Sequence, residues 1–114
     1  MFTGLVSENA IKKNEELRLE HYLRIQTTLT QLVRNHIQND IFNATEFVDT
    51  IMKCEQVHIV TRTENYAVMR AKGDYTAAGI NLVNWKKLNH EQQNYLWRKM
   101  LCGKVANHDK FKPT

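Results

Sequence analysis

The predicted fold depends first on a run of 31 residues, ENAIKKNEELRLEHYLRIQTTLTQLVRNHIQ (residues 8–38), which contains neither glycine nor proline. Glycine and proline are the strongest local breakers of regular structure, so the run predicts one long element. Ser7 is a suitable N-cap residue. Lys12 has an acid four residues away on either side, Glu8 and Glu16, which supports a helix. The sequence therefore predicts a long N-terminal helix over about residues 8–38.

The apolar residues of this run recur at helical spacing and fall on one broad side of the predicted helix. A helix of that length would reach about 46 Å, whereas a compact domain of this size is about 35 Å across. Part of the apolar side should therefore extend beyond the rest of the domain. We expect it to pair there with a second copy of the chain or with another protein. The residues expected to make this contact are Leu19, Tyr22, Leu29, Val33 and Ile37.

Two kinds of shorter element are predicted after the long helix. Asn43 and Glu46 have the spacing of a capping box, which indicates a short helix over about residues 44–54. Apolar and polar residues then alternate, a pattern typical of strands in an antiparallel sheet. The sequence predicts an antiparallel three-stranded meander over about residues 57–62, 65–71 and 75–83.

The end of the chain predicts one more helix. Asn89 and Gln92 repeat the capping spacing, and Gly103 stands where a helix commonly ends, so we expect a C-terminal helix over about residues 90–102. Residues 104–114 are expected to form a short, flexible basic tail. The fold class is α+β, with residues 1–114 as a single domain.

Composition excludes several classes of protein. The chain has 114 residues, of which 42% are hydrophobic and 25% charged, within the ordinary globular range. Cys54 and Cys102 are too few for a disulfide framework, so we expect a reducing, intracellular compartment such as the cytoplasm. The sequence contains no leader-like segment and no apolar run long enough to cross a bilayer, and we expect no membrane association.

Positive charge is concentrated near the end of the chain. Residues 1–56 hold six Lys/Arg against eight Asp/Glu, whereas residues 85–114 hold seven against two. Cations beside aromatic residues are typical of surfaces that contact phosphates and stack on bases, although an ordinary solvated face has the same composition. The residues that predict nucleic-acid binding are Lys86, Lys87, Arg98, Lys99, Lys104, Lys110 and Lys112 with Trp85, and Arg62, Arg70 and Lys72 would extend the patch.

A zinc site is the second candidate. Cys54 with His58 and Cys102 with His108 make two Cys/His pairs, enough for the four ligands of tetrahedral zinc. Neither pair has the tight spacing of recognised zinc motifs, and structural cysteines and surface histidines explain the same residues. We therefore expect no metal and no other cofactor.

Catalytic patterns are absent from the sequence. Ser7 is the only serine and is expected to cap a helix, and no cluster of glycines is available for a phosphate-binding loop. We therefore predict a small, non-enzymatic binding protein that contacts nucleic acid, or a nucleic-acid-bound complex, through its basic C-terminal third. The alternative is a protein-interaction module, such as a phage or mobile-element regulator or inhibitor, that uses the apolar side of the N-terminal helix.

Overall fold

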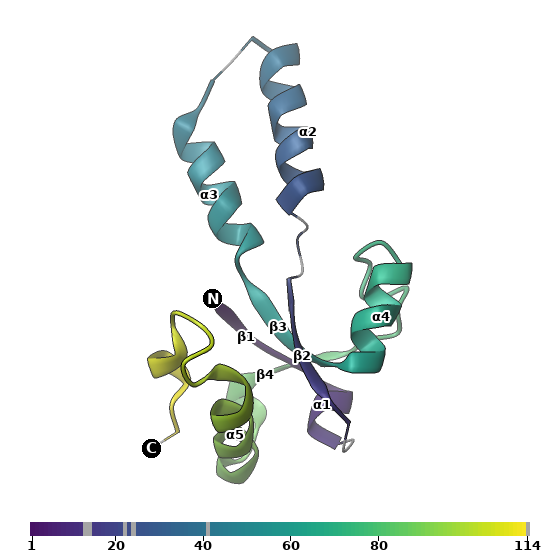
Figure 1. Cartoon of the computed structure of the whole chain (residues 1–114), viewed down its shortest axis with the longest axis vertical. Coiled ribbons are helices and arrows are strands. Elements are labelled where there is room, and N and C mark those ends of the chain that lie inside the picture. Colours follow the sequence, from purple (N-terminus) through teal and green to yellow (C-terminus); the bar gives the residue numbers. More distant parts are fainter. Residues whose placement is uncertain (13–14, 22, 24, 41, 114) are drawn as a thin grey trace. The chain divides into compact units, whose positions relative to one another are not determined.

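The computed structural model describes residues 1–12, 15–21, 23, 25–40 and 42–113. The chain has an α+β fold and divides into two units, residues 1–20 with 57–114 and residues 21–56. The first unit is a mixed sheet covered by helices, and the second is a helical hairpin (Figure 1). Along the sequence, the hairpin is inserted between the second and third strands.

The sheet of the first unit is built around its N-terminal strand, which is parallel to one neighbour and antiparallel to the other. In order along the described residues, the strands are β1 (Phe2–Ser7), β2 (Leu17–His21), β3 (Val57–Thr61) and β4 (Leu82–Asn84), and they lie in the order β2-β3-β1-β4. Phe2 pairs with Val57 and Val6 with Ile59, so β1 carries two more residues than β3 over the same span. The extra residues make β1 bulge.

Gly4 permits this bulge. Its φ of +87° lies in the region that glycine adopts without strain. A Cβ atom at this position would stand 3.4 Å from the ring of Phe111, which is van der Waals contact. A side chain here would strain the backbone because of the positive φ.

One face of the sheet packs against the C-terminal part of the chain. This part contains η1 (Trp85–Lys87), α5 (His90–Leu96), a π-helical turn η2 (Trp97–Leu101) and η3 (His108–Phe111). Phe111 lies edge-on to Phe2, with 4.7 Å between ring centroids, and Val105 is buried. Residues 104–113 therefore contribute to the core. The buried residues of this core are Phe2, Val6, Ala10, Leu17, Val57, Ile59, Trp85, Leu88, Leu96, Met100, Leu101 and Val105.

The opposite face of the sheet is covered by α4 (Arg62–Arg70) and holds a buried carboxylate. Side chains alternate along β3, so Val60 points away from the core formed by Val57 and Ile59. Glu64 of α4 accepts a 2.5 Å hydrogen bond from the Ser7 hydroxyl and a 3.0 Å bond from the Thr61 backbone N–H. A buried carboxylate with these donors fixes the start of α4 against β1.

The second unit consists of α2 (Ile25–Gln38) and α3 (Ala44–Cys54). The Asn43 side chain accepts a hydrogen bond from the Glu46 backbone N–H and so caps α3. Between the helices, Leu32, His36 and Cys54 are buried, whereas most other apolar side chains of the hairpin remain half-buried or exposed. This small seam leaves a large apolar area uncovered in the hairpin itself.

The long N-terminal helix over residues 8–38 was a wrong prediction. Ser7 does cap a helix, since its hydroxyl accepts from the Ala10 N–H at 3.0 Å, but this helix is the short α1 (Glu8–Lys12). Leu17 and Leu19 then follow a two-residue period and both pack on the core, so this segment forms β2. Of the predicted helix, α1 and α2 are helical, with the strand β2 between them.

The antiparallel meander was also a wrong prediction. Its first strand exists as β3, but residues 62–70 form α4, because Thr61 and Glu64 make a capping box at the end of β3. Of the predicted third strand, only Leu82 and Val83 are extended, as part of β4, and Gly79 adopts a φ of +73° within the preceding turns. The mixed sheet depends on β1, which the sequence reading did not identify as a strand.

The helices at 44–54 and 90–102 lie where the sequence predicts them, the latter as α5 followed by η2. Asn89 and Gln92 form a reciprocal capping box at the start of α5. Within the described residues, none of the helices has the length and apolar character that crossing a bilayer requires.

Candidate functional site

The most prominent charged feature is a set of exposed cations on the short C-terminal elements. The rings of Trp85 and Phe111 lie 5.9 Å apart, which places η1 beside η3. Lys104 donates to the Lys99 carbonyl at 2.8 Å, which joins the turn after η2 to η2 itself. We define the C-terminal cationic surface as the exposed residues Lys86, Lys87, Arg98, Lys99, Lys104, Lys110 and Lys112.

The charge of the C-terminal cationic surface is not neutralised internally. Among the described residues, no Asp or Glu side chain forms an ion pair with any of its seven cations. The same segment contains two acids, Glu91 and Asp109, and Asp109 pairs with His108. The surface therefore presents a strong positive potential to solvent.

Trp85 does not belong to this surface. Its side chain is only 6% exposed, and its ring lies edge-on to the rings of Phe2 and Phe111. A ring enclosed in the core cannot stack on a nucleic-acid base. The assignment of Trp85 as a base-stacking residue is therefore corrected to a core role.

Tyr95 and Trp97 are the aromatic residues that accompany the cations. Tyr95 is 53% exposed, and its hydroxyl accepts a 3.0 Å hydrogen bond from Lys99, whose ammonium lies 5.3 Å from the ring centroid. The Lys112 ammonium lies 5.7 Å from the ring centroid of Trp97. Sequence reasoning missed Tyr95, although its position four residues before Lys99 in a predicted helix was a usable signal.

The proposed extension of the cationic patch lies on a different part of the sheet unit. Arg62 and Arg70 belong to α4, whereas the C-terminal cationic surface lies on elements that cover the other sheet face (Figure 1). Arg62 also pairs with Glu16 at 3.3 Å. Arg18, and then Arg62, lower the pKa of the Glu16 carboxyl. The residues Arg62, Arg70 and Lys72 are exposed but do not continue the surface formed by η1, η2 and η3.

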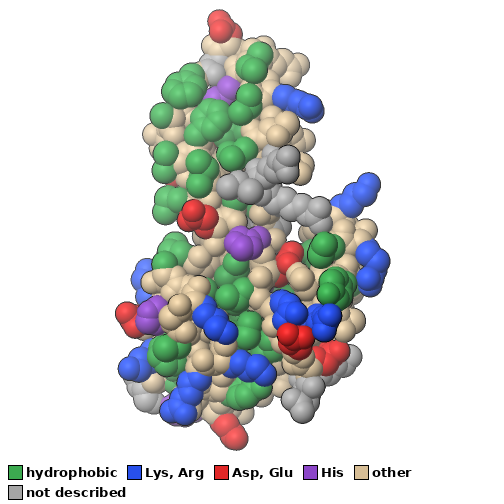
Figure 2. Space-filling model, in the orientation of Figure 1, with side chains coloured by type: hydrophobic (Ala, Val, Ile, Leu, Met, Phe, Trp, Pro, Cys, Tyr) green, Lys and Arg blue, Asp and Glu red, His purple; other side chains and the backbone are tan. Residues whose placement is uncertain are grey.

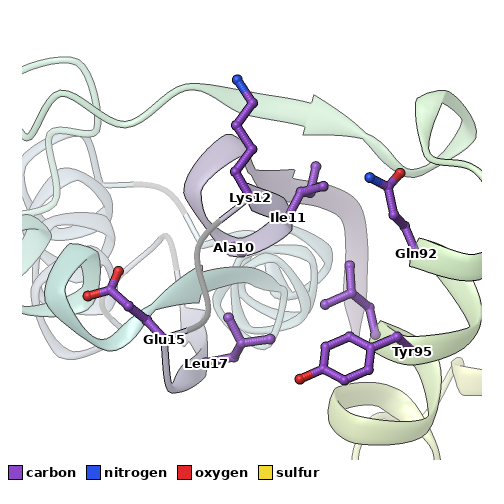
Figure 3. A pocket seen from close by; sticks show the side chains of 8 residues that line it. Ala10, Ile11, Lys12, Glu15, Leu17, Gln92 and Tyr95 are labelled. Carbon is purple, nitrogen blue, oxygen red and sulfur yellow. The ribbon is translucent and has the colours of Figure 1, made fainter.

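A small pocket adjoins α5 (Figure 3). It has a volume of about 190 Å³ and lies between the α1–β2 segment and α5. The Tyr95 ring and the side chain of Ile11 face it from opposite elements. Its apolar lining is Ala10, Ile11, Leu17 and Leu96, and its polar lining is Lys12, Glu15, Gln92 and Tyr95.

The predicted partner-binding residues separate into three groups. Leu19 is half-buried and packs against the core of the sheet unit. Tyr22 lies outside the described residues. Leu29, Val33 and Ile37 are one turn apart on α2, and Ile37 is 76% exposed.

Further apolar residues of the hairpin lie on the same side as this row. Leu32 and Phe47 face the seam. In a pair of antiparallel helices, the residues directly after them, Val33 and Val48, lie on the same side of the pair. Phe42 is 80% exposed and lines a groove together with Val33, Ile37 and Phe47. Figure 2 shows hydrophobic side chains gathered over the hairpin. We define the hairpin apolar side as Leu29, Val33, Ile37, Phe42, Val48, Ile51 and Met52.

The two Cys/His pairs do not assemble a metal site in the described structure. Cys54 is buried in α3, His58 is buried in β3, and Cys102 is exposed after η2. The imidazole of His108 pairs with Asp109. Within the described ranges, no three His, Cys, Asp or Glu side chains come together in a way that could hold a metal ion.

Several polar groups are buried behind α4, but their contacts are structural. The His58 Nδ1 atom lies 2.6 Å from the Thr3 hydroxyl, and burial lowers the pKa of His58 from 6.5 to about 4. Burial, and then the negative charges of Glu20 and Glu64, raise the pKa of Tyr75. Ser7 is fully buried, so its hydroxyl cannot meet a substrate.

Comparisons with known proteins give no relative from which a role could be transferred: no family model, curated protein or solved structure matches this chain. The described residues offer three accessible features: the C-terminal cationic surface, the pocket beside Tyr95, and the hairpin apolar side.

Proposed function

We propose that this protein binds nucleic acid through the C-terminal cationic surface, without catalysing a reaction on it. The observation that carries the proposal is the set of seven exposed cations that pair with no carboxylate among the described residues. A polyanion supplies the missing negative charge, and its condensed counterions are released when the cations replace them. Phosphate contacts do not read the bases, so we expect nucleic acids of different sequence to bind with similar affinity.

The core beneath the surface supports this function. Trp85, Leu101 and Val105 are buried, so η1, η2 and the turn after η2 are anchored to the sheet unit. Anchored backbone limits the conformational entropy that the cations lose on binding, because only their side chains must be ordered. Lys and Arg side chains held on anchored elements can therefore bind a phosphate backbone at a lower entropic cost.

Charge reversal at the cationic surface tests the proposal. We expect Lys104→Glu with Lys110→Glu to weaken binding to a fluorescent single-stranded oligonucleotide by about tenfold or more in low salt, measured by anisotropy. The matched control is Arg34→Glu with Lys53→Glu, which changes net charge equally but alters exposed residues of the hairpin. Equal loss in both double variants would show that net charge, and not this surface, governs binding.

A second candidate function is supported by the exposure of the hairpin apolar side. We propose that this side pairs with the same side of a second copy of the chain. The hairpin unit has 36 residues and buries only a thin seam, and units below about 40 residues usually need a disulfide, a metal or an oligomeric partner. Cys54 is a free cysteine, so among the described residues no disulfide stabilises the hairpin.

The charges of the hairpin favour a second copy over a strongly charged partner. Residues 21–56 hold three Lys/Arg against four Asp/Glu, so two hairpins repel each other little. Asp40 lines the groove beside Val33, Ile37 and Phe42, and the residues of the hairpin apolar side are themselves uncharged. Two hairpins joined in this way would make a four-helix arrangement and give the assembly two cationic surfaces, which increases avidity for a long polyanion.

A further inference from the structure

The pocket beside Tyr95 is continuous with the C-terminal cationic surface. Tyr95 lines the pocket, and the same side chain accepts the hydrogen bond from Lys99. The Lys99 ammonium lies 5.3 Å from the Tyr95 ring centroid. A strand whose phosphate lies at Lys99 would therefore have its neighbouring base within reach of the pocket.

The chemistry of the pocket suits one planar aromatic ring. Leu17 and Leu96 are buried and form part of an apolar floor, and the exposed Tyr95 ring offers a stacking partner. The volume of about 190 Å³ lies below the range of about 300–1,000 Å³ typical of sites for drug-sized ligands and cofactors. A single ring system fits such a pocket better than a whole nucleotide cofactor does.

Polar groups at the rim can hold the edge of that ring. The Gln92 side-chain oxygen accepts from the Asn89 N–H, and this bond turns the Gln92 amide nitrogen toward the pocket (Figure 3). The amide nitrogen is a donor for the carbonyl oxygens and ring nitrogens of bases. Lys12 extends from the rim into solvent, and its ammonium lies 3.8 Å from the Glu8 carboxylate.

We infer that the pocket receives one unpaired base of a single-stranded nucleic acid, stacked on Tyr95, with the flanking phosphate at Lys99. This inference rests on the proposed function and adds a preference for single strands. Bases in a duplex are stacked and paired, and moving one out costs several kcal/mol, so a duplex meets only the cations. Phosphates and unpaired bases are common to DNA and RNA, so we expect single strands of both to bind.

The experiment compares two tyrosine variants. Tyr95→Ala removes the proposed stacking ring, and Tyr66→Ala is the control, because Tyr66 is 45% exposed and has the Arg62 guanidinium 5.7 Å from its ring. Binding of each variant to single-stranded DNA, single-stranded RNA and duplex DNA is measured by anisotropy. We expect Tyr95→Ala to weaken single-strand binding by about 5- to 150-fold and to leave duplex binding and the salt dependence unchanged. Tyr66→Ala should match the unmodified protein.

A second measurement does not depend on how well the variant folds. Oligonucleotides in which abasic linkers replace the bases keep their phosphates but offer no ring. The unmodified protein should bind them more weakly than normal strands by a factor similar to the Tyr95→Ala effect. If normal and abasic strands bind equally, or if Tyr95→Ala and Tyr66→Ala behave alike, the pocket does not take a base. In that case, continued binding of normal and abasic strands would still support the cationic surface as the binding site. If no nucleic acid binds, the inference and the proposed function both fail.

Discussion

Burial decides which aromatic side chain can meet a ligand. Trp85 and Tyr95 both stand near lysines in the sequence, but Trp85 is enclosed between Phe2 and Phe111, and Tyr95 is exposed beside Lys99. The sequence showed that cations and aromatic residues occur together near the end of the chain. It could not show which ring faces solvent, because that depends on how η1 packs against a strand more than seventy residues earlier.

Because Trp85 lies in the core, replacing it should make the fold less stable without removing a ring that stacks on a nucleic-acid base. We expect Trp85→Ala to lower the free energy of unfolding by about 3–5 kcal/mol, because it leaves a cavity between Phe2 and Phe111. Urea denaturation measures this change. Unchanged stability together with weaker single-strand binding would contradict the assignment and return Trp85 to the binding surface.

The burial of His58 predicts a pH-dependent contribution to stability. Its pKa falls from 6.5 to about 4 in the folded protein, so between these values the unfolded chain binds more protons than the folded chain. This stabilising contribution is complete above pH 6.5 and is lost as the pH falls toward 4. We expect His58→Phe to flatten the decline of unfolding free energy in this window, as followed by urea denaturation at several pH values. The exposed His90, changed to Gln, is the control, and an equal flattening there would contradict the role of His58.

At the scale of elements, local capping signals predict the helix starts correctly, whereas the sequence does not predict how distant strands pair. Asn43 and Asn89 mark the starts of α3 and α5, because caps are set by residues three apart. The strand β2 was assigned to a helix because Leu19 falls within the helical arc of the apolar residues that follow it, although Leu17 lies outside that arc. The parallel pairing of β1 with β3 joins segments about fifty residues apart, and nothing local to either segment reports it.

The hairpin apolar side predicts self-association that one substitution should remove. We expect Ile37→Asp to convert a dimer, with twice the chain mass of 13.4 kDa, into a folded monomer, because Ile37 is 76% exposed and its loss leaves the seam intact. Sedimentation measures the mass, and circular dichroism checks the helices. Gln31→Asp, on an exposed position of α2 facing away from this side, should remain a dimer. A monomeric unmodified protein at about 100 µM would overturn the pairing, since specific dimers of this kind assemble well below that concentration.

At the scale of the whole molecule, charge and apolar exposure are divided between the two units. The sheet unit carries the C-terminal cationic surface, and the nearly neutral hairpin carries an uncovered apolar side. The sequence predicted this concentration of charge from composition alone. It could not predict that Arg62 and Arg70 would fall on α4, and Lys72 just after it, apart from the other cations, because that separation follows from the two-faced sheet.

The salt dependence of binding tests nucleic-acid binding through the C-terminal cationic surface most directly. Each phosphate contact with a single strand should contribute about −0.7 to the slope of log affinity against log salt concentration, so four or five contacts predict a slope of about −3. Lys104→Glu with Lys110→Glu should flatten that slope by about 1.4, and Arg34→Glu with Lys53→Glu should leave it unchanged. A slope near zero, or no binding to DNA or RNA at about 50 mM salt, where such contacts are strong, would contradict the proposed function.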